Sequence, residues 1–400
     1  MGKRQQTDIK TLFEPNKLVK VCAPMVRYSK LQFRNLVKKY DCDLVFTPMI
    51  LADSFCKSAK ARSNEFTTNL LDTPLVAQFA ANTIHDFVGA SYLISPYCDG
   101  VDLNCGCPQG WAREQELGCQ MLRNPQSIYA LIRECRNQIC KPFSVSVKMR
   151  LLKDLKKSVE ICRQLERCGA SFLSVHARTP ECSVGPIDKH GLRAVVESVE
   201  IPVIGNGGVG SLENCIELQE CAKVAGVMVA NGILANPTLF SGTNVTPMRC
   251  VQDWLDICYN STLGVQEYEK LCGSEQLSGA PAHIMRLFRG FLNNAKHNLK
   301  NNPVQETSKQ LAIEINSNVF ATISFEKVDE NTYDLVHTTI PEELRGRGLG
   351  HIFAERIFDH LAGNGRKIKL TCEFLQEYFV KNRVKYSGLI IEDFETRAAP

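Results

Sequence analysis

The sequence predicts an α/β chain made of a (β/α)8 TIM barrel, a small helical domain and a C-terminal α+β domain. Short apolar runs of strand length alternate with longer segments of helical periodicity up to about residue 240. Eight such runs occur, and the alternation ends after Asn236-Pro237. A chain of 400 residues is long enough for two or three domains, each with its own core.

The eight apolar runs are expected to be the barrel strands. They lie at 18–23, 44–47, 75–78, 100–104, 144–149, 172–177, 203–206 and 226–230. Helical patterns lie between them at 29–40, 127–140, 155–168, 191–199 and 212–221. Eight consecutive βα units in a segment of this size favour a closed parallel barrel over residues 1–243. An open doubly wound sheet is the alternative, although no GxGxxG motif follows the first run.

Beyond the barrel the pattern changes twice. Residues 244–302 show helical periodicity only, with helices expected at 250–261 and 282–300. From residue 303 to 400 we expect a separate α+β domain. Its strands are predicted at 310–315, 319–326, 332–337 and 367–372, and its helices at 349–362 and from 374 onward.

Composition and charge narrow the class of protein. A net charge of +4 is too small to mark a nucleic-acid-binding protein, so any RNA-binding surface must be local. The 18 cysteines have no CxxC spacing, and the polar start shows no signal peptide. No apolar run reaches membrane-spanning length. We expect a monomer with reduced thiols and no bound metal, located in the cytoplasm or also in the nucleus.

Polar residues follow the predicted strands at their carboxyl ends, where TIM barrels carry their reactive groups. One buried Lys or His is more often a satisfied core residue, but seven such positions on one rim predict a site. The positions, in chain order, are Pro24, Met25 and Val26; Gln78; Asn104 to Cys107; Lys148; His176 and Arg178; Asn206, Gly207 and Gly208; and Ala230 with Asn231.

The last two loops predict a phosphate site. The glycine-containing turns at 206–208 and 230–232 can expose backbone N–H groups, and TIM barrels hold phosphate after their last two strands. A phosphate-bearing cofactor held there would place its ring over the barrel mouth. Lys148 and Gln78 suit an isoalloxazine ring, because Lys supplies positive charge and Gln both donates and accepts. A structural ion pair is the alternative role for Lys148.

At this point the residues resemble a known family. Asn104-x-Gly106-Cys107-Pro108, followed by Gly118 and Met121-Leu122, is similar to the signature of the tRNA-dihydrouridine synthases. Five further motifs of that family follow the same order: 23–25, 147–150, 175–179, 205–208 and 236–237. Residues 108–112 and 27–31 resemble the eukaryotic branch that modifies positions 20a and 20b of tRNA. Asn231 stands where many members carry Arg.

The resemblance implies an FMN enzyme that takes electrons from NADPH and acts on tRNA. Hydride would pass to C6 of uracil and a proton from Cys107 to C5, since a thiol with a pKa of about 8.5 is protonated at neutral pH. Asn104 and Arg178 would contact the substrate. The residues implied to hold FMN are Pro24, Met25, Val26, Gln78, Lys148, His176, Asn206, Gly207, Gly208, Ala230 and Asn231.

The helical domain is expected to contact RNA. Between residues 276 and 305 there is no acidic residue, while basic residues recur at helical spacing. Such a stripe is more often a solvated face, but the resemblance places tRNA on this domain. The basic residues expected to bind tRNA are Arg286, Arg289 and Lys296.

The C-terminal domain carries a second resemblance. The run Arg345, Gly346, Arg347, Gly348, Leu349 and Gly350 is similar to the coenzyme A pyrophosphate loop of the GNAT N-acetyltransferases. It implies acetyl-CoA binding, with an ordinary loop as the alternative. Cys372 is either a reactive residue or a buried thiol.

Two other functions remain open from the sequence. One is a pyrimidine oxidoreductase of the same flavin barrel fold that acts on a small molecule. The other is a tRNA-binding acetyltransferase with an inactive barrel. The presence of Cys107, Lys148 and His176 argues against an inactive barrel.

Overall fold

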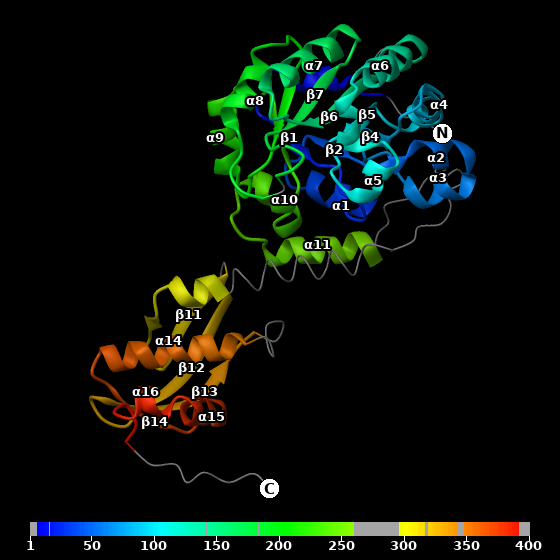
Figure 1. Ribbon diagram of the computed structural model, residues 1–400. Coiled ribbons are helices and arrows are strands. Elements are labelled where there is room, and N and C mark those ends of the chain that lie inside the picture. The colour runs from blue at the N-terminus through cyan, green and yellow to red at the C-terminus, as the bar shows by residue number, and fades with distance from the viewer. Residues whose placement is uncertain are drawn as a thin grey trace. The chain divides into compact units, whose positions relative to one another are not determined.

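The computed structural model describes residues 6–15, 17–140, 142–182, 184–259, 296–316, 319–341 and 348–391. The chain divides into two compact units, Met1–Leu287 and Phe288–Pro400 (Figure 1).

The first unit is a closed parallel barrel in which all eight predicted strands form. They are β1 (Val19–Cys22), β2 (Leu44–Phe46), β4 (Leu75–Ala80), β5 (Gly100–Cys105), β6 (Ser144–Arg150), β7 (Phe172–His176), β8 (Val203–Asn206) and β9 (Gly226–Val229). Neighbouring strands follow the order β2-β1-β9-β8-β7-β6-β5-β4, and the parallel pairing of β2 with β4 closes the ring. A short extra strand, β3 (Ile50–Leu51), pairs with the end of β4. The barrel prediction is confirmed, and the open doubly wound sheet was the wrong alternative.

Helices surround the barrel on its outside (Figure 1). The main ones are α1 (Leu31–Lys38), α4 (Ile84–Ile94), α6 (Gln126–Gln138), α7 (Leu155–Arg167), α8 (Lys189–Val196) and α9 (Leu212–Ala222). Several begin where a polar side chain accepts the backbone N–H three residues later, which satisfies a donor that the first turn leaves unpaired. These N-cap residues are Thr83, Asp154, Asp188 and Ser211. Shorter helices occupy the loops: α2 (Ala52–Lys57), α3 (Ala59–Glu65), α5 (Gly110–Glu114) and α10 (Asn231–Ala235).

The helix α11 (Met248–Tyr259) packs on the barrel helix α1. The ring of Trp254 lies edge-on to Phe33, with 6.4 Å between ring centroids. The Tyr40 hydroxyl donates to Asp253 Oδ2 at 2.6 Å. This helix corresponds to the one predicted at 250–261.

Most of the helix predicted at 282–300 lies outside the described residues. Residues 296–301 are helical and belong to the second unit, within which Asn298 Nδ2 donates to the Ile315 carbonyl at 2.7 Å and Leu299 is buried. The division into domains at 244 and 303 therefore stays a prediction.

The second unit is a mixed sheet with helices. Its strands are β10 (Gln305–Glu306), β11 (Gln310–Asn316), β12 (Val319–Lys327), β13 (Thr332–Thr339) and β14 (Lys367–Leu370). The first four run antiparallel, and β14 lies parallel to β13 after a crossover through α14 (Leu349–Gly363). The helices α15 (Glu373–Lys381) and α16 (Arg383–Tyr386) follow. The predicted α+β domain is confirmed.

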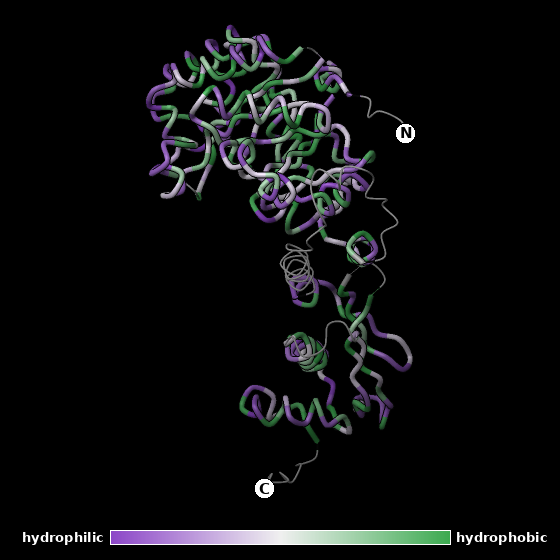
Figure 2. The backbone as a smooth tube through the Cα atoms, turned by 90° about the vertical axis from the view of Figure 1, so that its right-hand side faces the viewer, coloured by the Kyte–Doolittle hydropathy of each residue, from purple (hydrophilic) through white to green (hydrophobic). Residues whose placement is uncertain are grey.

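Each unit has its own hydrophobic interior. In Figure 2 the hydrophobic residues concentrate inside the units and the hydrophilic ones toward the outside. Within the described part of the chain, no helix has the length and apolar character needed to cross a membrane.

Candidate active site

The polar strand ends meet at one mouth of the barrel. Gln78 on β4 lies in register with Asp102 on β5, and Asn104 lies in register with Lys148 on β6. On the other side of Lys148, His176 on β7 lies in register with Asn206 on β8. The structure therefore brings together the side chains predicted at Gln78, Asn104, Lys148, His176 and Asn206.

Asn104 shapes the loop that carries Cys107. Its Oδ1 accepts the backbone N–H of Gly106 at 3.1 Å and of Cys107 at 3.0 Å. Its Nδ2 donates to Gln78 Oε1 at 2.9 Å. Because both ends of this amide are used, the turn after β5 has one defined geometry, and it leaves Cys107 half-buried at the mouth.

Gly118 allows the next segment to approach this loop. Its φ of 64° lies in the left-handed region, and a Cβ there would lie 2.5 Å from the Cys107 carbonyl oxygen. The following N–H, from Cys119, donates to that same carbonyl at 3.0 Å. The glycine in the signature is therefore explained by close backbone contact with the Cys107 loop.

Arg150, which sequence reasoning recognised only as part of a motif, ties two active-site loops together. Its Nε donates to the Gly106 carbonyl at 2.9 Å. Its Nη1 donates to the carbonyls of Thr179 and Cys182, each at 3.2 Å. Three backbone carbonyls from two loops converge on one guanidinium, an arrangement that a linear sequence does not reveal.

Lys148 is not part of an ion pair within the described residues. Its Nζ donates to Asn206 Oδ1 at 3.2 Å, and Asn206 Nδ2 donates to the Met228 carbonyl at 2.7 Å. Burial lowers the pKa of Lys148 to about 8, and the charge of Asp102 offsets this only in part. A half-buried ammonium that is hydrogen-bonded to a neutral amide is a suitable partner for an anionic ligand.

His176 is held neutral. Burial is the main cause, and the cations Lys148, Arg150 and Arg178 add to it, so that its pKa falls to about 3. Its Nε2 lies 3.3 Å from Arg178 Nη1, which can only donate. Nε2 is therefore the acceptor, and the ring proton sits on Nδ1.

This histidine should make the barrel sensitive to acid. Because the pKa of His176 is lower in the folded chain than the ordinary 6.5, the unfolded chain binds its proton first as the pH falls, and stability is lost below pH 6.5. We expect the change in the free energy of unfolding between pH 6.5 and pH 5 to be more favourable by about 2 kcal/mol in His176→Gln than in the unmodified chain, as measured by urea unfolding. The control is His190→Gln, which changes an exposed histidine on α8; an unchanged pH dependence in His176→Gln would contradict the assignment.

The loops after β8 and β9 form a tight pair. Gly207 has a φ of 122°, and a Cβ on it would lie 3.0 Å from His176 Cδ2. Gly208 has a φ of 70°. A Cβ on Gly232 would lie 2.5 Å from the Val209 carbonyl oxygen, so the two loops touch there. These close approaches fit a cradle for a phosphate group, bordered by Ala230 and the exposed Asn231.

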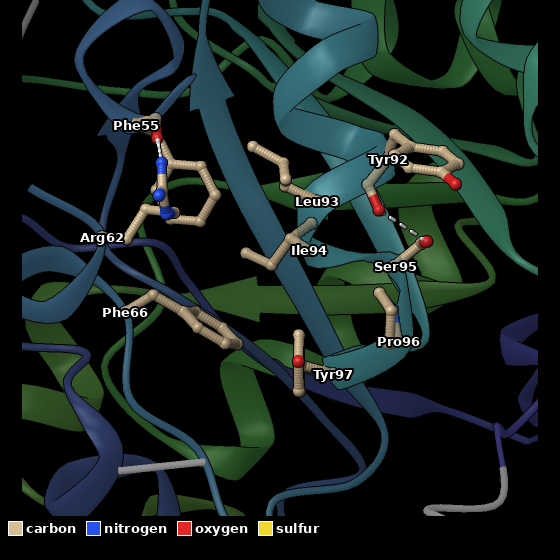
Figure 3. A pocket seen from close by; sticks show the side chains of 9 residues that line it. All are labelled: Phe55, Arg62, Phe66, Tyr92, Leu93, Ile94, Ser95, Pro96 and Tyr97. Carbon is tan, nitrogen blue, oxygen red and sulfur yellow. Dashed lines mark hydrogen bonds between the residues drawn. The ribbon is translucent and has the colours of Figure 1, made fainter. Parts of the chain in front are cut away.

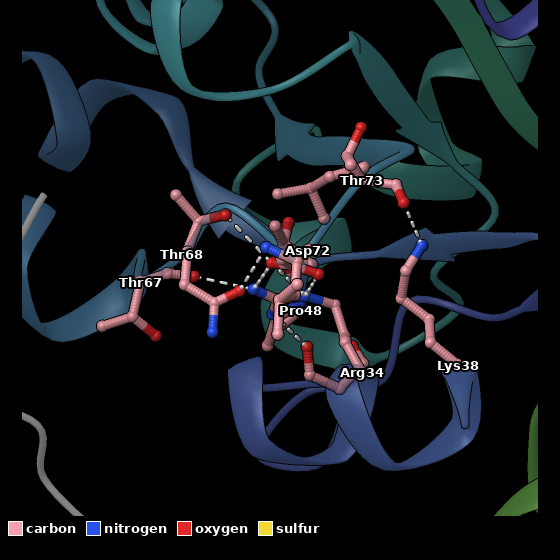
Figure 4. A network of polar contacts seen from close by, with 12 residues as sticks. Arg34, Lys38, Pro48, Thr67, Thr68, Asp72 and Thr73 are labelled. Atoms are coloured by element: carbon pink, nitrogen blue, oxygen red, sulfur yellow. Dashed lines mark hydrogen bonds and ion pairs between the residues drawn. The ribbon is translucent and has the colours of Figure 1, made fainter. Parts of the chain in front are cut away.

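A buried ion pair stabilises the loop after β1 (Figure 4). Arg34 Nη2 lies 2.6 Å from Asp72 Oδ2, and both side chains are almost fully buried. Arg34 Nη1 donates to the Ser29 carbonyl and Nη2 to the Thr67 carbonyl, each at 2.7 Å. Ser29 Oγ accepts the N–H of Met25 at 2.9 Å.

The predicted residues Pro24, Met25 and Val26 thus lie on a braced loop. Within it Met25 is buried and Val26 is 54% exposed, so only part of this loop can face a ligand inside the mouth.

Not every predicted residue joins the site. Arg178 reaches it with one nitrogen only: Nη1 lies 3.3 Å from His176 Nε2, while Nε and Nη2 donate to the Gly185 carbonyl at 3.0 and 2.6 Å. Lys296 lies on a helical segment of the second unit. Arg286 and Arg289 lie outside the described residues, as do Arg345, Gly346 and Arg347.

In the second unit, only the end of the predicted coenzyme A loop is described. Gly348 has a φ of 77° and precedes α14. Leu349 is buried, and a Cβ on Gly350 would lie 2.7 Å from the ring of Phe374. The Cys372 thiol is buried 3.4 Å from Thr338 Oγ1.

A cavity of about 430 Å³ lies away from these residues, between α2, α3 and the end of α4 (Figure 3). Its walls are largely apolar, and Arg62 Nη1 turns to the Phe55 carbonyl at 2.8 Å. None of the predicted site residues lines it.

Comparison with known proteins gives two family matches. The family model described as dihydrouridine synthase (Dus) matches residues 21–324. The model described as GCN5-related N-acetyl-transferase matches residues 310–389.

Among similar proteins are three tRNA-dihydrouridine(20a/20b) synthases. Those of Homo sapiens and Mus musculus, both named with the suffix "like", are 47% and 46% identical, cover 62% of this chain and are themselves covered over 78% and 76%. The protein of Schizosaccharomyces pombe is 40% identical over 61% of this chain and 76% of its own length.

Proposed function

The chain belongs to the dihydrouridine synthase family and is an oxidoreductase of the tRNA-dihydrouridine synthase type, and on that premise we propose that it reduces uracil at positions 20a and 20b of the tRNA D-loop. The reaction is the saturation of the C5=C6 bond with electrons from NADPH. One observation carries the proposal: polar side chains of five adjoining strands surround the same mouth that presents Cys107.

The residues of the mouth fit FMN. Lys148 offers a half-buried ammonium with a neutral partner, and Gln78 lies next to it along the mouth, where its amide is hydrogen-bonded to Asn104, the register partner of Lys148. The paired loops around Gly207, Gly208 and Gly232 fit the phosphate end. When bound, FMN would supply the hydride that adds to C6 of uracil. Asn231 gives this site an uncharged side chain, so phosphate binding would depend on backbone N–H groups.

A residue of the chain would supply the proton that is added to uracil. The Cys107 thiol would give its proton to C5 of uracil on the face away from the flavin site. Its backbone is held at the N–H by Asn104 and at the carbonyl by Cys119, so the thiol is presented from a fixed loop. His176 is neutral and does not compete as an acid, because its pKa lies near 3. The target base would leave its stack to enter the mouth.

The purified protein can be tested for the proposed flavin and for the proposed reaction. We expect the purified protein to be yellow, to release FMN on denaturation, and to convert unmodified tRNA with NADPH into tRNA that contains dihydrouridine at 20a or 20b, read by mass spectrometry. Free uracil is the control substrate. Reduction of free uracil but not tRNA would favour a small-molecule enzyme, and a colourless protein that cannot be reconstituted with FMN would overturn both.

We further propose that the second unit binds acetyl-CoA. The support is the match over residues 310–389 and the start of α14 directly after the glycine-containing loop. Titration calorimetry of the full chain with acetyl-CoA should give a binding isotherm that Gly348→Val weakens, and no measurable heat with the unmodified chain would remove this proposal. The basic residues Arg286, Arg289 and Lys296 remain the proposed tRNA contacts.

A further inference from the structure

The carboxylate of Asp102 lies inside the barrel and takes no part in the reaction proposed above. The residue is fully buried in the middle of β5. Its Oδ1 accepts from the Ser146 hydroxyl at 2.7 Å, and its Oδ2 accepts from Gln78 Nε2 at 2.8 Å. A buried carboxylate is costly unless it is hydrogen-bonded, so its retention at this point requires a reason.

The hydrogen bonds beyond Asp102 run in one direction. An ionised carboxylate only accepts, so Gln78 must turn its NH₂ group toward Asp102 and its Oε1 away. Gln78 Oε1 then accepts from Asn104 Nδ2 at 2.9 Å, which leaves Asn104 Oδ1 for the two N–H groups of Gly106 and Cys107.

The hydrogen bonds that run from Asp102 through Gln78 and Asn104 to the N–H groups of Gly106 and Cys107 form a relay. Both ends of this relay require the same orientation of the two amides. At one end two backbone N–H groups require an oxygen, and at the other a carboxylate requires a donor. Without the carboxylate, Gln78 Nε2 loses its acceptor, and only the two backbone N–H groups at the far end still set the orientation of the amides.

We propose that Asp102 is the positioning residue for the Cys107 loop: by fixing the amide of Gln78, and through it that of Asn104, it holds the backbone N–H groups of Gly106 and Cys107. The catalytic meaning of this relay rests on the proposed role of Cys107. The hydrogen bonds of the relay join groups of the protein only, so they can be tested without the reaction.

The charge state of Asp102 agrees with its position. Burial raises its pKa to about 6, while the hydrogen bonds from Gln78 and Ser146 and the charge of Lys148 pull the pKa down. The titratable groups near it are Lys148 on β6 and Cys105 on its own strand. At neutral pH Asp102 is therefore ionised and accepts hydrogen bonds only.

Amide hydrogen exchange of the cofactor-free protein tests the relay directly. Asp102→Leu should speed exchange at the Gly106 and Cys107 amides about tenfold, because their acceptor is no longer held. Ser146→Ala is the matched control: it removes the other hydrogen bond to the same carboxylate and leaves the relay whole, so exchange at these amides should stay unchanged.

Asp102→Asn should restore the slow exchange. Its oxygen can face Gln78 while its NH₂ group faces Ser146, whose hydroxyl can accept as well as donate. If Asp102→Leu does not fold, Gln78→Met interrupts the same relay one residue later and should give the same local exchange.

The turnover of the same variants separates this inference from the proposed function. Dihydrouridine formation should fall about tenfold in Asp102→Leu and recover in Asp102→Asn. Unchanged exchange at both amides in Asp102→Leu, or in Gln78→Met if that variant is used, would overturn the inference whatever the activity. An unmodified protein that forms no dihydrouridine, but whose variants show the expected exchange, would overturn the proposed function and leave the relay in place.

Discussion

Cys107→Ala is expected to lower dihydrouridine formation by a factor of about 10² to 10⁴ while the protein keeps its flavin. The thiol is the proposed proton donor, whereas the loop that carries it is held by backbone contacts to Asn104 and Cys119 that alanine retains. The measurement pairs the turnover number on unmodified tRNA with the flavin absorbance of each preparation.

Cys119→Ala is the matched control for this substitution. Cys119 is half-buried like Cys107, and its backbone N–H donates to the Cys107 carbonyl at 3.0 Å. Its side chain has no proposed role, so Cys119→Ala should turn over at close to the rate of the unmodified protein. Full activity in Cys107→Ala would remove that residue from its role, and equal losses in both variants would indicate damage to the loop.

The strands and the mouth could be predicted because each strand carries its own signal. An apolar run that ends in Lys148 or His176 is visible in a few residues, and parallel strands bring their carboxyl ends to the same edge. The alternation of sides along β5 also placed Asn104 and Asp102 on one face, two residues apart. Sequence reasoning used only Asn104, since a lone Asp in an apolar run gives no partner.

What could not be predicted depends on contacts between distant residues. The role of Arg150 needs the Thr179 and Cys182 carbonyls, about thirty residues away in the chain. Arg34 stands in a helix of ordinary amphipathic pattern, yet it is 1% exposed and bonded to Asp72, which lies 38 residues further on. The periodicity of apolar residues indicates which face of a helix is buried. It does not predict that a charged residue on that face forms an ion pair.

Arg34→Met is expected to destabilise the barrel by about 3 to 5 kcal/mol, the second large effect. The substitution leaves Asp72 buried without its cation, and it releases the carbonyls of Ser29 and Thr67 from their donor. Urea unfolding of the full chain, followed by the signal of the barrel unit, measures this loss. Lys38→Met, which removes a half-buried cation from the same helix and its bond to the Thr73 carbonyl, should cost less than about 1 kcal/mol.

A double variant separates the two causes of this loss. In Arg34→Met with Asp72→Leu no charge is left buried and unpaired, so the double variant should be more stable than Arg34→Met alone. The hydrogen bond to the Ser29 carbonyl is still missing, so the loop that carries Met25 should remain less well ordered. Flavin affinity should therefore not recover together with stability. A double variant that is no more stable than the single one would place the energy in the two carbonyl contacts. Recovery of flavin affinity together with stability would mean that the ion pair acts on the whole barrel and not on this loop.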